Sequence, residues 1–166
     1  MQFSNVYIDT ISYELAPHVI TTEELEQQLE PFYKKINFNI GQVESLTGII
    51  ERRFWDVSHT MHENAAKAGK KAIEKSGISP SDIGMVVYGG VCRDQLEPST
   101  ACAVAEALDI NQNAEVFDVS NACLGVLTGM VRIASAIELG LIKSGIVVSC
   151  ESSRQIVDLT IKRILD

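Results

Sequence analysis

Cys123 lies where the pattern changes within the stretch FDVSNACLGVLTGM, residues 117–130. Residues 116–119 form a short apolar run typical of a strand, and a run with helical spacing follows. A cysteine in the first turn of a helix meets unsatisfied N–H groups and a partial positive charge, which favour the nucleophilic thiolate. Small neighbours, Ala122 and Gly125, leave room for a substrate. The pattern alone also allows an inert core thiol, because cysteine is among the most buried residue types.

The elements that would position Cys123 alternate between strands and helices. Such alternation indicates right-handed crossovers and a parallel or mixed sheet with helices on both faces, that is, an α/β layered fold. The final helix is amphipathic and no later element covers it, so we expect it to need a neighbour. We predict strands at residues 6–15, 85–90, 116–119 and 145–150, helices at residues 22–35, 58–77, 98–108, 122–139 and 153–166, and a short helix with an exposed loop in residues 36–56.

The composition limits the classes of function. A chain of 166 residues is long enough for one domain with a real core. The net charge of -8, with no basic stripe, argues against a nucleic-acid partner. We expect a cytoplasmic protein, because the N-terminus lacks a leader pattern and no apolar run reaches the ~20 residues of a membrane span. The four cysteines fit neither metal pairs nor a disulfide framework.

Several motifs together resemble the thiolase superfamily, specifically the 3-oxoacyl-acyl-carrier-protein synthase III group. They are TGIIERR, LEPSTACAVAEAL, FDVSNACLGVLTGM and GLIKSGIVVSCES, which occur in the family's order and spacing over nearly the whole chain. The resemblance implies a thiolase-like layered fold, one half of the family's α-β-α-β-α architecture, and a homodimer joined beside the strand before Cys123. It also implies that Cys123 is the cysteine that a thioester acylates.

A closer resemblance is to the acyl-CoA condensing enzymes of long-chain olefin biosynthesis (OleA type). RRFWD and RDQLEPSTA carry it, with Glu97 before Pro-Ser-Thr where the carrier-protein synthases usually have an aromatic residue. In the olefin-type enzymes this glutamate is thought to reach the partner subunit's site and deprotonate the second acyl chain. A Claisen condensation without decarboxylation needs such a base. Without the resemblance, Glu97 could equally be a solvated loop carboxylate or a cap for the helix after Pro98.

Other candidates concern substrate binding and metals. Arg52 and Arg53 could bind coenzyme A phosphates or an acidic carrier protein, because guanidinium groups suit phosphate, or they could be a solvated pair. An arginine commonly precedes TGI in the carrier-protein synthases, and Leu46 stands there instead. We assign no metal site, because the three histidines match no catalytic histidine of the family and offer no ligand set. They are His18, His59 and His62.

The resemblance implies that catalysis also needs a histidine and an asparagine from a C-terminal repeat of the same topology. We therefore expect residues 1–166 to be an N-terminal thiolase-like domain that is inactive alone and works with a C-terminal half. The expected substrates are acyl-CoA or acyl-carrier-protein thioesters, with no bound cofactor. The alternatives are a decarboxylative synthase III, a non-catalytic scaffold subunit, and a redox-sensing thiol protein centred on Cys123.

Overall fold

The computed structural model describes residues 2–166, which divide into two compact units. The larger unit carries Cys123 and Glu97, and the smaller unit carries Arg52 and Arg53. The assignment of the whole chain to one thiolase-like domain stays a prediction. The larger unit consists of residues 2–14 and 59–151, and the smaller unit of residues 15–58 and 152–166.

A three-stranded parallel sheet forms the centre of the larger unit. Strand β3 (Ile83–Tyr88) lies between β4 (Glu115–Asp118) and β5 (Ser144–Val148). Val86 is paired with Val116 on one side and Ile146 on the other. All of β3 except Gly84 is buried, as expected of a strand covered on both faces. The predicted α/β sheet is therefore confirmed, and β4 and β5 are its edges.

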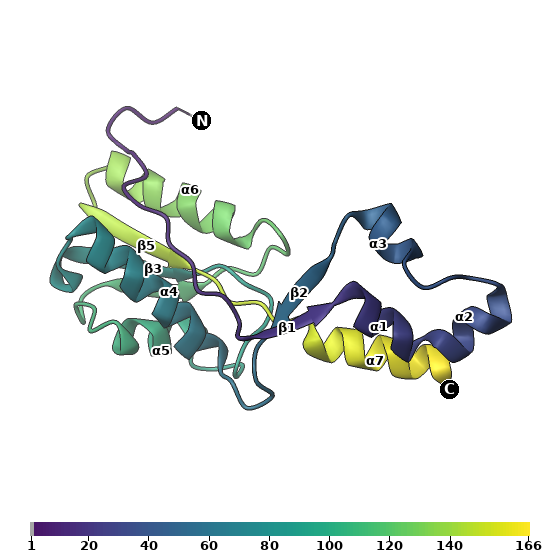
Figure 1. Cartoon of the computed structure of the whole chain (residues 1–166). Coiled ribbons are helices and arrows are strands. Elements are labelled where there is room, and N and C mark those ends of the chain that lie inside the picture. Colours follow the sequence, from purple (N-terminus) through teal and green to yellow (C-terminus); the bar gives the residue numbers. More distant parts are fainter. Residues whose placement is uncertain (1) are drawn as a thin grey trace. The chain divides into compact units, whose positions relative to one another are not determined.

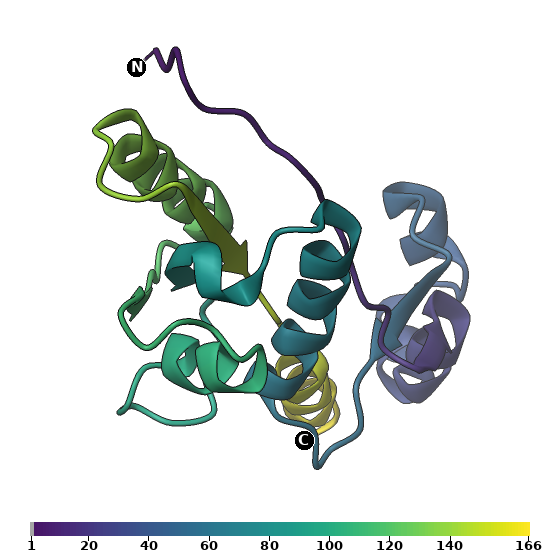
Figure 2. The same cartoon turned by 90° about the vertical axis from the view of Figure 1, so that its left-hand side faces the viewer.

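Helices cover both faces of this sheet (Figure 1). Helices α4 (Met61–Ser76) and α5 (Thr100–Ala107) contact each other on one face, and α6 (Gly125–Glu138) packs against β3 and β5 on the other, as the second view also shows (Figure 2). Met85 and Val87 of β3 form a core cluster with α6. A single helical turn, η1 (Pro80–Asp82), leads into β3.

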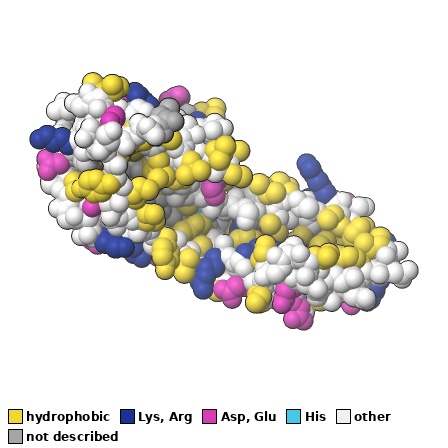
Figure 3. All heavy atoms as spheres, turned by 90° about the horizontal axis from the view of Figure 1, so that it is seen from above, with side chains coloured by type: hydrophobic (Ala, Val, Ile, Leu, Met, Phe, Trp, Pro, Cys, Tyr) yellow, Lys and Arg dark blue, Asp and Glu magenta, His cyan; other side chains and the backbone are white. Residues whose placement is uncertain are grey.

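The outer side of α6 remains apolar. Leu124, directly before this helix, and Leu127 and Val131 within it are 54%, 55% and 44% exposed. Hydrophobic side chains also lie on the face of the larger unit that is seen from above (Figure 3).

Among residues 2–166, no helix combines the length and the apolar character needed to cross a membrane.

The smaller unit combines a two-stranded antiparallel sheet with four helices. Strands β1 (His18–Thr21) and β2 (Glu51–Phe54) pair with Val19 opposite Arg53 and Ile20 opposite Arg52. Thr21 and Glu24 form a capping box: the Thr21 side chain accepts from the Glu24 backbone N–H, and the Glu24 carboxylate accepts from the Thr21 backbone N–H. The elements are β1 (His18–Thr21), α1 (Thr22–Gln28), α2 (Glu30–Ile36), α3 (Gln42–Thr47), β2 (Glu51–Phe54) and α7 (Arg154–Leu165).

The predicted strand at residues 6–15 is wrong. These residues are extended but unpaired, and Tyr7 and Ile8 are 81% and 62% exposed. Alternation is not sufficient for a strand, because the backbone groups also need a neighbouring edge to bond. Instead, residues 5–12 line one side of an apolar hollow of about 750 Å³, whose other walls are α4, α6 and β5.

Two predictions in the smaller unit also need correction. The predicted single helix at residues 22–35 is two helices, because the chain turns at Leu29, directly before Glu30 and Pro31 at the first positions of α2. Proline fits the first turn of a helix but not its interior. The predicted exposed loop around Arg52 and Arg53 is strand β2.

Candidate active site

The two proposed catalytic residues come from segments that follow neighbouring strands. Glu97 lies in the loop of residues 89–99 after β3, and Cys123 lies in the turn after β4. Because the three strands are parallel, their carboxyl ends meet at one edge of the sheet, the usual place for ligand sites in open α/β sheets. Glu151, just beyond β5, contributes a third polar side chain at the same edge.

The turn that carries Cys123 packs closely against the chain directly after β3. The backbone of Gly125 lies against that of Gly89: a Cβ built on Gly125 would stand 2.9 Å from the Gly89 carbonyl carbon. Ala122, directly before Cys123, has a φ of 45°, a conformation that costs energy for a residue with a side chain. The Leu124 N–H donates to the Asn121 carbonyl at 2.9 Å. The sequence between strand and helix is therefore folded into a tight turn against the end of β3.

The predicted place of Cys123 in the first helical turn is wrong. Helix α6 begins at Gly125, so Cys123 precedes it by two residues, and the predicted start at Ala122 is three residues too early. The positive φ of Ala122 interrupts the helical conformation there. Cys123 is a free thiol with an exposed side chain, which removes the interpretation as a buried core thiol. Cys150, by contrast, is buried.

The first part of the Glu97 loop is held by Tyr88 and Glu151. The buried Tyr88 hydroxyl lies 2.7 Å from the Cys92 carbonyl oxygen and 2.6 Å from that of Cys150. Burial, together with nearby Cys150 and Glu151, raises the pKa of the Tyr88 phenol, so the hydroxyl stays a donor. The Glu151 carboxylate accepts from the N–H groups of Val91 at 2.6 Å and Cys92 at 3.2 Å.

Asp94, in the middle of the loop, attaches it to α4. Its carboxylate accepts from the backbone N–H groups of Met61 at 2.6 Å and His62 at 2.9 Å, and the His62 ring lies 2.7 Å away. Asp94 thereby satisfies the free N–H groups at the start of α4. Burial raises the pKa of this carboxyl, but the hydrogen bonds from His62 and Met61 outweigh it, and the net pKa is lowered.

Asp118, the last residue of β4, holds the end of the loop. Its side chain is 5% exposed and accepts from the N–H groups of Thr100 and Ala101, both at 2.9 Å. It also lies 3.8 Å from the Arg93 guanidinium. The cap of α5 is therefore Asp118, so the alternative interpretation of Glu97 as that cap is wrong.

Glu97 differs from these neighbouring carboxylates. Its side chain is exposed, and within residues 2–166 no hydrogen bond or ion pair engages its carboxylate. The peptide bond to Pro98 is cis. Leu96, beside it, is 86% exposed. The loop thus presents a free carboxylate on a segment whose two ends are fixed.

Arg52 and Arg53 lie in the smaller unit, and both have local partners. Arg52 donates to the Thr22 hydroxyl at 3.4 Å. Arg53 donates to the Ala16 carbonyl at 3.3 Å and lies 3.7 Å from Glu51. These contacts are long and partly exposed, so they are weak. Phosphate binding by the two arginines stays a prediction.

The histidines have protein partners rather than metal-site geometry. His18 lies 2.5 Å from Asp56, and His62 is bound to Asp94. Over the described part of the chain, no three side chains of the metal-binding types come together.

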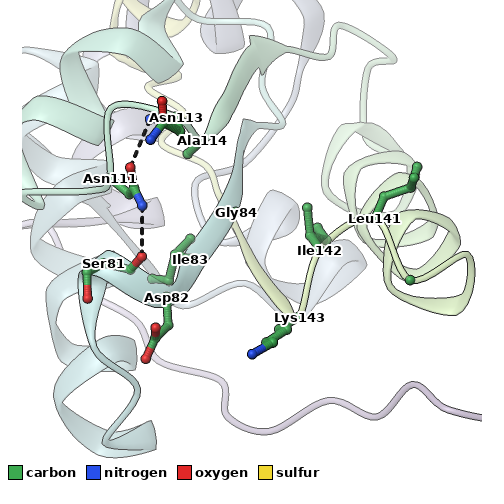
Figure 4. A pocket seen from close by; sticks show the side chains of 11 residues that line it. Ser81, Asp82, Ile83, Gly84, Asn111, Asn113, Ala114, Leu141, Ile142 and Lys143 are labelled. Atoms are coloured by element: carbon green, nitrogen blue, oxygen red, sulfur yellow. Dashed lines mark hydrogen bonds between the residues drawn. The ribbon is translucent and has the colours of Figure 1, made fainter.

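A second hollow, of about 400 Å³, lies at the opposite end of the sheet from Cys123, around Asp82, Asn111 and Lys143 (Figure 4). Asn111 spans its rim by donating to the Ser81 carbonyl at 3.1 Å. Because the amino ends of the strands meet there, this hollow is separate from the edge that carries Cys123 and Glu97.

Comparison with known proteins identifies the family. The family model described as the N-terminal domain of thiolase matches residues 48–160. The chain belongs to the thiolase family, and the matched part is its N-terminal domain. Cys123, Glu97 and the parallel sheet all lie within it.

Two curated relatives show which enzymes of this family the chain is similar to. An acyl-CoA:acyl-CoA alkyltransferase of Shewanella oneidensis is 52% identical over 99% of this chain and 47% of its own length. A beta-ketoacyl-acyl-carrier-protein synthase III of Bacillus cereus is 33% identical over 93% of this chain and 47% of its own length. The chain therefore spans about half the length of the curated relatives it matches.

Solved structures of OleA from Xanthomonas campestris share the fold. One, with a glutamate substituted, has a TM-score of 0.93 and 32% identity, and the match covers all of this chain and 51% of that one. Another has the cysteine replaced by serine and holds lauric acid and lauroyl-CoA, with a TM-score of 0.93. The substituted glutamate and cysteine of OleA are as many residues apart as Glu97 and Cys123 are here.

Proposed function

We propose that this chain is the nucleophile-carrying half of an enzyme that joins two acyl-CoA molecules by a non-decarboxylative Claisen condensation. One observation carries the proposal: an exposed thiol and a carboxylate without partners lie on loops after adjacent parallel strands, at the sequence separation of the two residues substituted in OleA. The 52% identity to an acyl-CoA:acyl-CoA alkyltransferase supports the same assignment.

In the first half-reaction, the Cys123 thiolate attacks the thioester carbonyl of one acyl-CoA. The new S–C bond forms, the bond to the coenzyme A sulfur breaks, and coenzyme A leaves as its thiol after taking up a proton. The exposed position of Cys123 and the glycine two residues on leave the sulfur open to an incoming acyl group. The acyl chain is then held as a thioester on Cys123.

In the second half-reaction, the Glu97 carboxylate removes a proton from carbon 2 of another acyl-CoA. The resulting enolate carbon attacks the acyl-Cys123 carbonyl, a C–C bond forms, and the bond to the Cys123 sulfur breaks. The proton on Glu97 returns to solvent, and the thiolate is regenerated. Two acyl-CoA molecules thus give one coenzyme A and a 3-oxoacyl-CoA that carries an alkyl group at carbon 2.

The dimer and the second half of the enzyme belong to this proposal. We assign Glu97 to the site of a partner subunit, because the loop presents its carboxylate outward beside exposed Leu96. The free edge of β4 and the exposed apolar residues of α6 support a homodimer at that edge. The groups that polarise the thioester carbonyl are assigned to the C-terminal half, so residues 1–166 alone are expected to be inactive. Arg52 and Arg53 are the candidates for binding coenzyme A phosphates, and no bound cofactor is required.

A decarboxylative synthase III is the second candidate, and the 33% identity to such a synthase supports it. With a malonyl substrate, loss of CO₂ generates the carbanion, and Glu97 would not be needed. The two candidates therefore differ in what they require of this one side chain.

The test uses the full-length enzyme containing this chain. Incubation with a long-chain acyl-CoA, followed by intact mass and peptide mapping, is expected to give an acyl adduct on Cys123 that is absent in Cys123→Ser. Glu97→Gln is expected to keep the adduct and to lower condensation of two acyl-CoA molecules by about 10²–10⁴-fold, the usual contribution of a general base. Glu106→Gln, an exposed glutamate on α5, is the matched control. Strict dependence on a malonyl substrate, with Glu97→Gln active, would establish the second candidate instead.

A further inference from the structure

The position of Glu97 is not fixed by its own side chain. Its carboxylate has no hydrogen bond or ion pair within the described residues, whereas a general base must lie within hydrogen-bond reach of the proton that it removes. The position of the Glu97 carboxylate must therefore be set by contacts of the residues on either side of Glu97. The relevant contacts are those of Arg93, four residues before it, and of Thr100 and Ala101, three and four residues after it.

One buried carboxylate engages both sides of Glu97. Asp118 lies 3.8 Å from the Arg93 guanidinium and accepts from the N–H groups of Thr100 and Ala101 at 2.9 Å. Its side chain is 5% exposed, so these contacts lie in a site of low effective dielectric, where losing one partner is costly. Asp118 thereby fixes both ends of the segment of residues 93–100, which contains Glu97 and is called the Glu97 arc below.

The same residue also begins the turn to the nucleophile. Asp118 is the last residue of β4, and the next residue, Val119, donates to the Tyr88 carbonyl at 2.8 Å, which continues the β3–β4 ladder. Cys123 follows five residues after Asp118. The Glu97 arc and the Cys123 turn therefore share one rigid attachment point at the end of β4.

We infer that Asp118 is a positioning residue that holds the Glu97 loop in the conformation needed for the condensation step, with Arg93 as its partner on the loop. This inference rests on the proposed function, because it assigns Asp118 an effect that is transmitted through Glu97. Within the described residues the Asp118 carboxylate engages Thr100, Ala101 and Arg93, and no hydrogen bond joins it to Cys123. Glu151 and Tyr88 hold the start of the loop, and Asp94 holds its middle. Loss of Asp118 therefore displaces the segment between Asp94 and Thr100, which contains Glu97, rather than the whole loop.

The test compares the two half-reactions in full-length enzyme carrying Asp118→Asn. The asparagine amide removes the ion pair with Arg93 and turns an N–H₂ group toward a site that holds donors. Acylation of Cys123, followed by intact mass, is expected to stay within about threefold of the native rate, whereas condensation falls by roughly 10²-fold, as for a misplacement near 1 Å. Glu106→Gln is again the control. If the asparagine variant does not fold, Arg93→Gln is the second variant, because it keeps the hydrogen bonds from the Thr100 and Ala101 N–H groups to Asp118. It is expected to lower the condensation rate about tenfold and to leave the acylation rate unchanged.

A double variant separates positioning from general destabilisation. If Asp118 acts through Glu97, then Glu97→Gln combined with Asp118→Asn condenses no more slowly than Glu97→Gln alone. Multiplicative losses in the double variant would refute the inference. Native condensation by Asp118→Asn, with Glu97→Gln impaired, would refute it while leaving the proposed function intact. Native condensation by Glu97→Gln would remove the base role itself, and the inference would fall with it.

Discussion

Substituting Gly125 by alanine should disturb the Cys123 turn through direct backbone contact. A Cβ at Gly125 would stand 2.9 Å from the Gly89 carbonyl carbon, 3.0 Å from the Gly89 oxygen and 3.3 Å from the Gly90 nitrogen. All three are backbone atoms, so no side chain can rotate away to relieve the contact. The start of α6 and the end of β3 must separate, and the turn between Asn121 and Gly125 moves with them.

The expected cost follows from overpacking a close backbone contact. Forcing one extra carbon into a well-packed site costs about 1–3 kcal/mol. Alanine gains less than about 1 kcal/mol from its helix propensity over glycine, which offsets only part of this. We therefore expect Gly125→Ala to lower the free energy of unfolding by roughly 0–2 kcal/mol, which is the overpacking cost less about 1 kcal/mol of helix propensity.

The assay combines urea unfolding with thiol reactivity in the full-length protein. Gly125→Ala is expected to lower the urea midpoint and to change the rate at which a disulfide reagent such as DTNB labels Cys123. Ser135→Ala, on the same helix, is the control, because the Ser135 hydroxyl donates to the Val131 carbonyl one turn earlier, within the helix itself. An unchanged midpoint together with an unchanged labelling rate would show that Gly125 and Gly89 are not in close contact.

Three further predictions test individual contacts. In the folded protein the pKa of the Asp94 carboxyl lies below its ordinary value of 3.8, so ionised Asp94 stabilises the fold above that value, and this stabilisation is lost as the pH falls through the lower folded pKa. Asp94→Asn should therefore weaken the acid dependence of unfolding midpoints measured from pH 6 to pH 2. Thr21→Ala removes the cap of α1 and should cost about 1 kcal/mol in urea unfolding, whereas restoring the cap with Ser should recover most of it. Brief treatment with iodoacetamide should alkylate exposed Cys123 well before buried Cys150 by peptide mass, and equal rates would contradict the burial of Cys150.

Local patterns predicted the elements of the larger unit better than those of the smaller one. The continuous apolar runs around Val86 and Ile146 identify strands, because strands of a parallel sheet with helices on its faces need such runs. Short strands such as β2, with two arginines in four residues, carry no such signal. Their pairing depends on a partner strand 30 to 36 residues away. Residues 6–15 show the reverse case, in which an alternating pattern has no neighbouring strand to pair with.

The sequence draws attention to the two proposed catalytic residues but not to the residues that hold their loops. Cys123 and Glu97 stand out in the sequence because their motifs resemble a known family. Asp118 and Glu151 were not predicted, since their roles depend on N–H groups 17 to 60 residues away that only the fold brings near. A signal was present nevertheless: each is an acidic residue at or just beyond the end of a strand of the parallel sheet, the usual place for ligand sites.

Hydrogen bonding divides the acidic residues of this edge into two kinds. Glu151, Asp94 and Asp118 each accept two or more backbone N–H groups, so their oxygen lone pairs are committed to holding loops and helix ends. A lone pair that already holds a donor is poorly placed to take a proton from substrate carbon, because the contact must first be broken. Glu97 alone among these four carries no such commitment in the described residues. The three bound carboxylates therefore hold the loop in place, and Glu97 is the acidic residue of this edge whose carboxylate is not engaged in doing so.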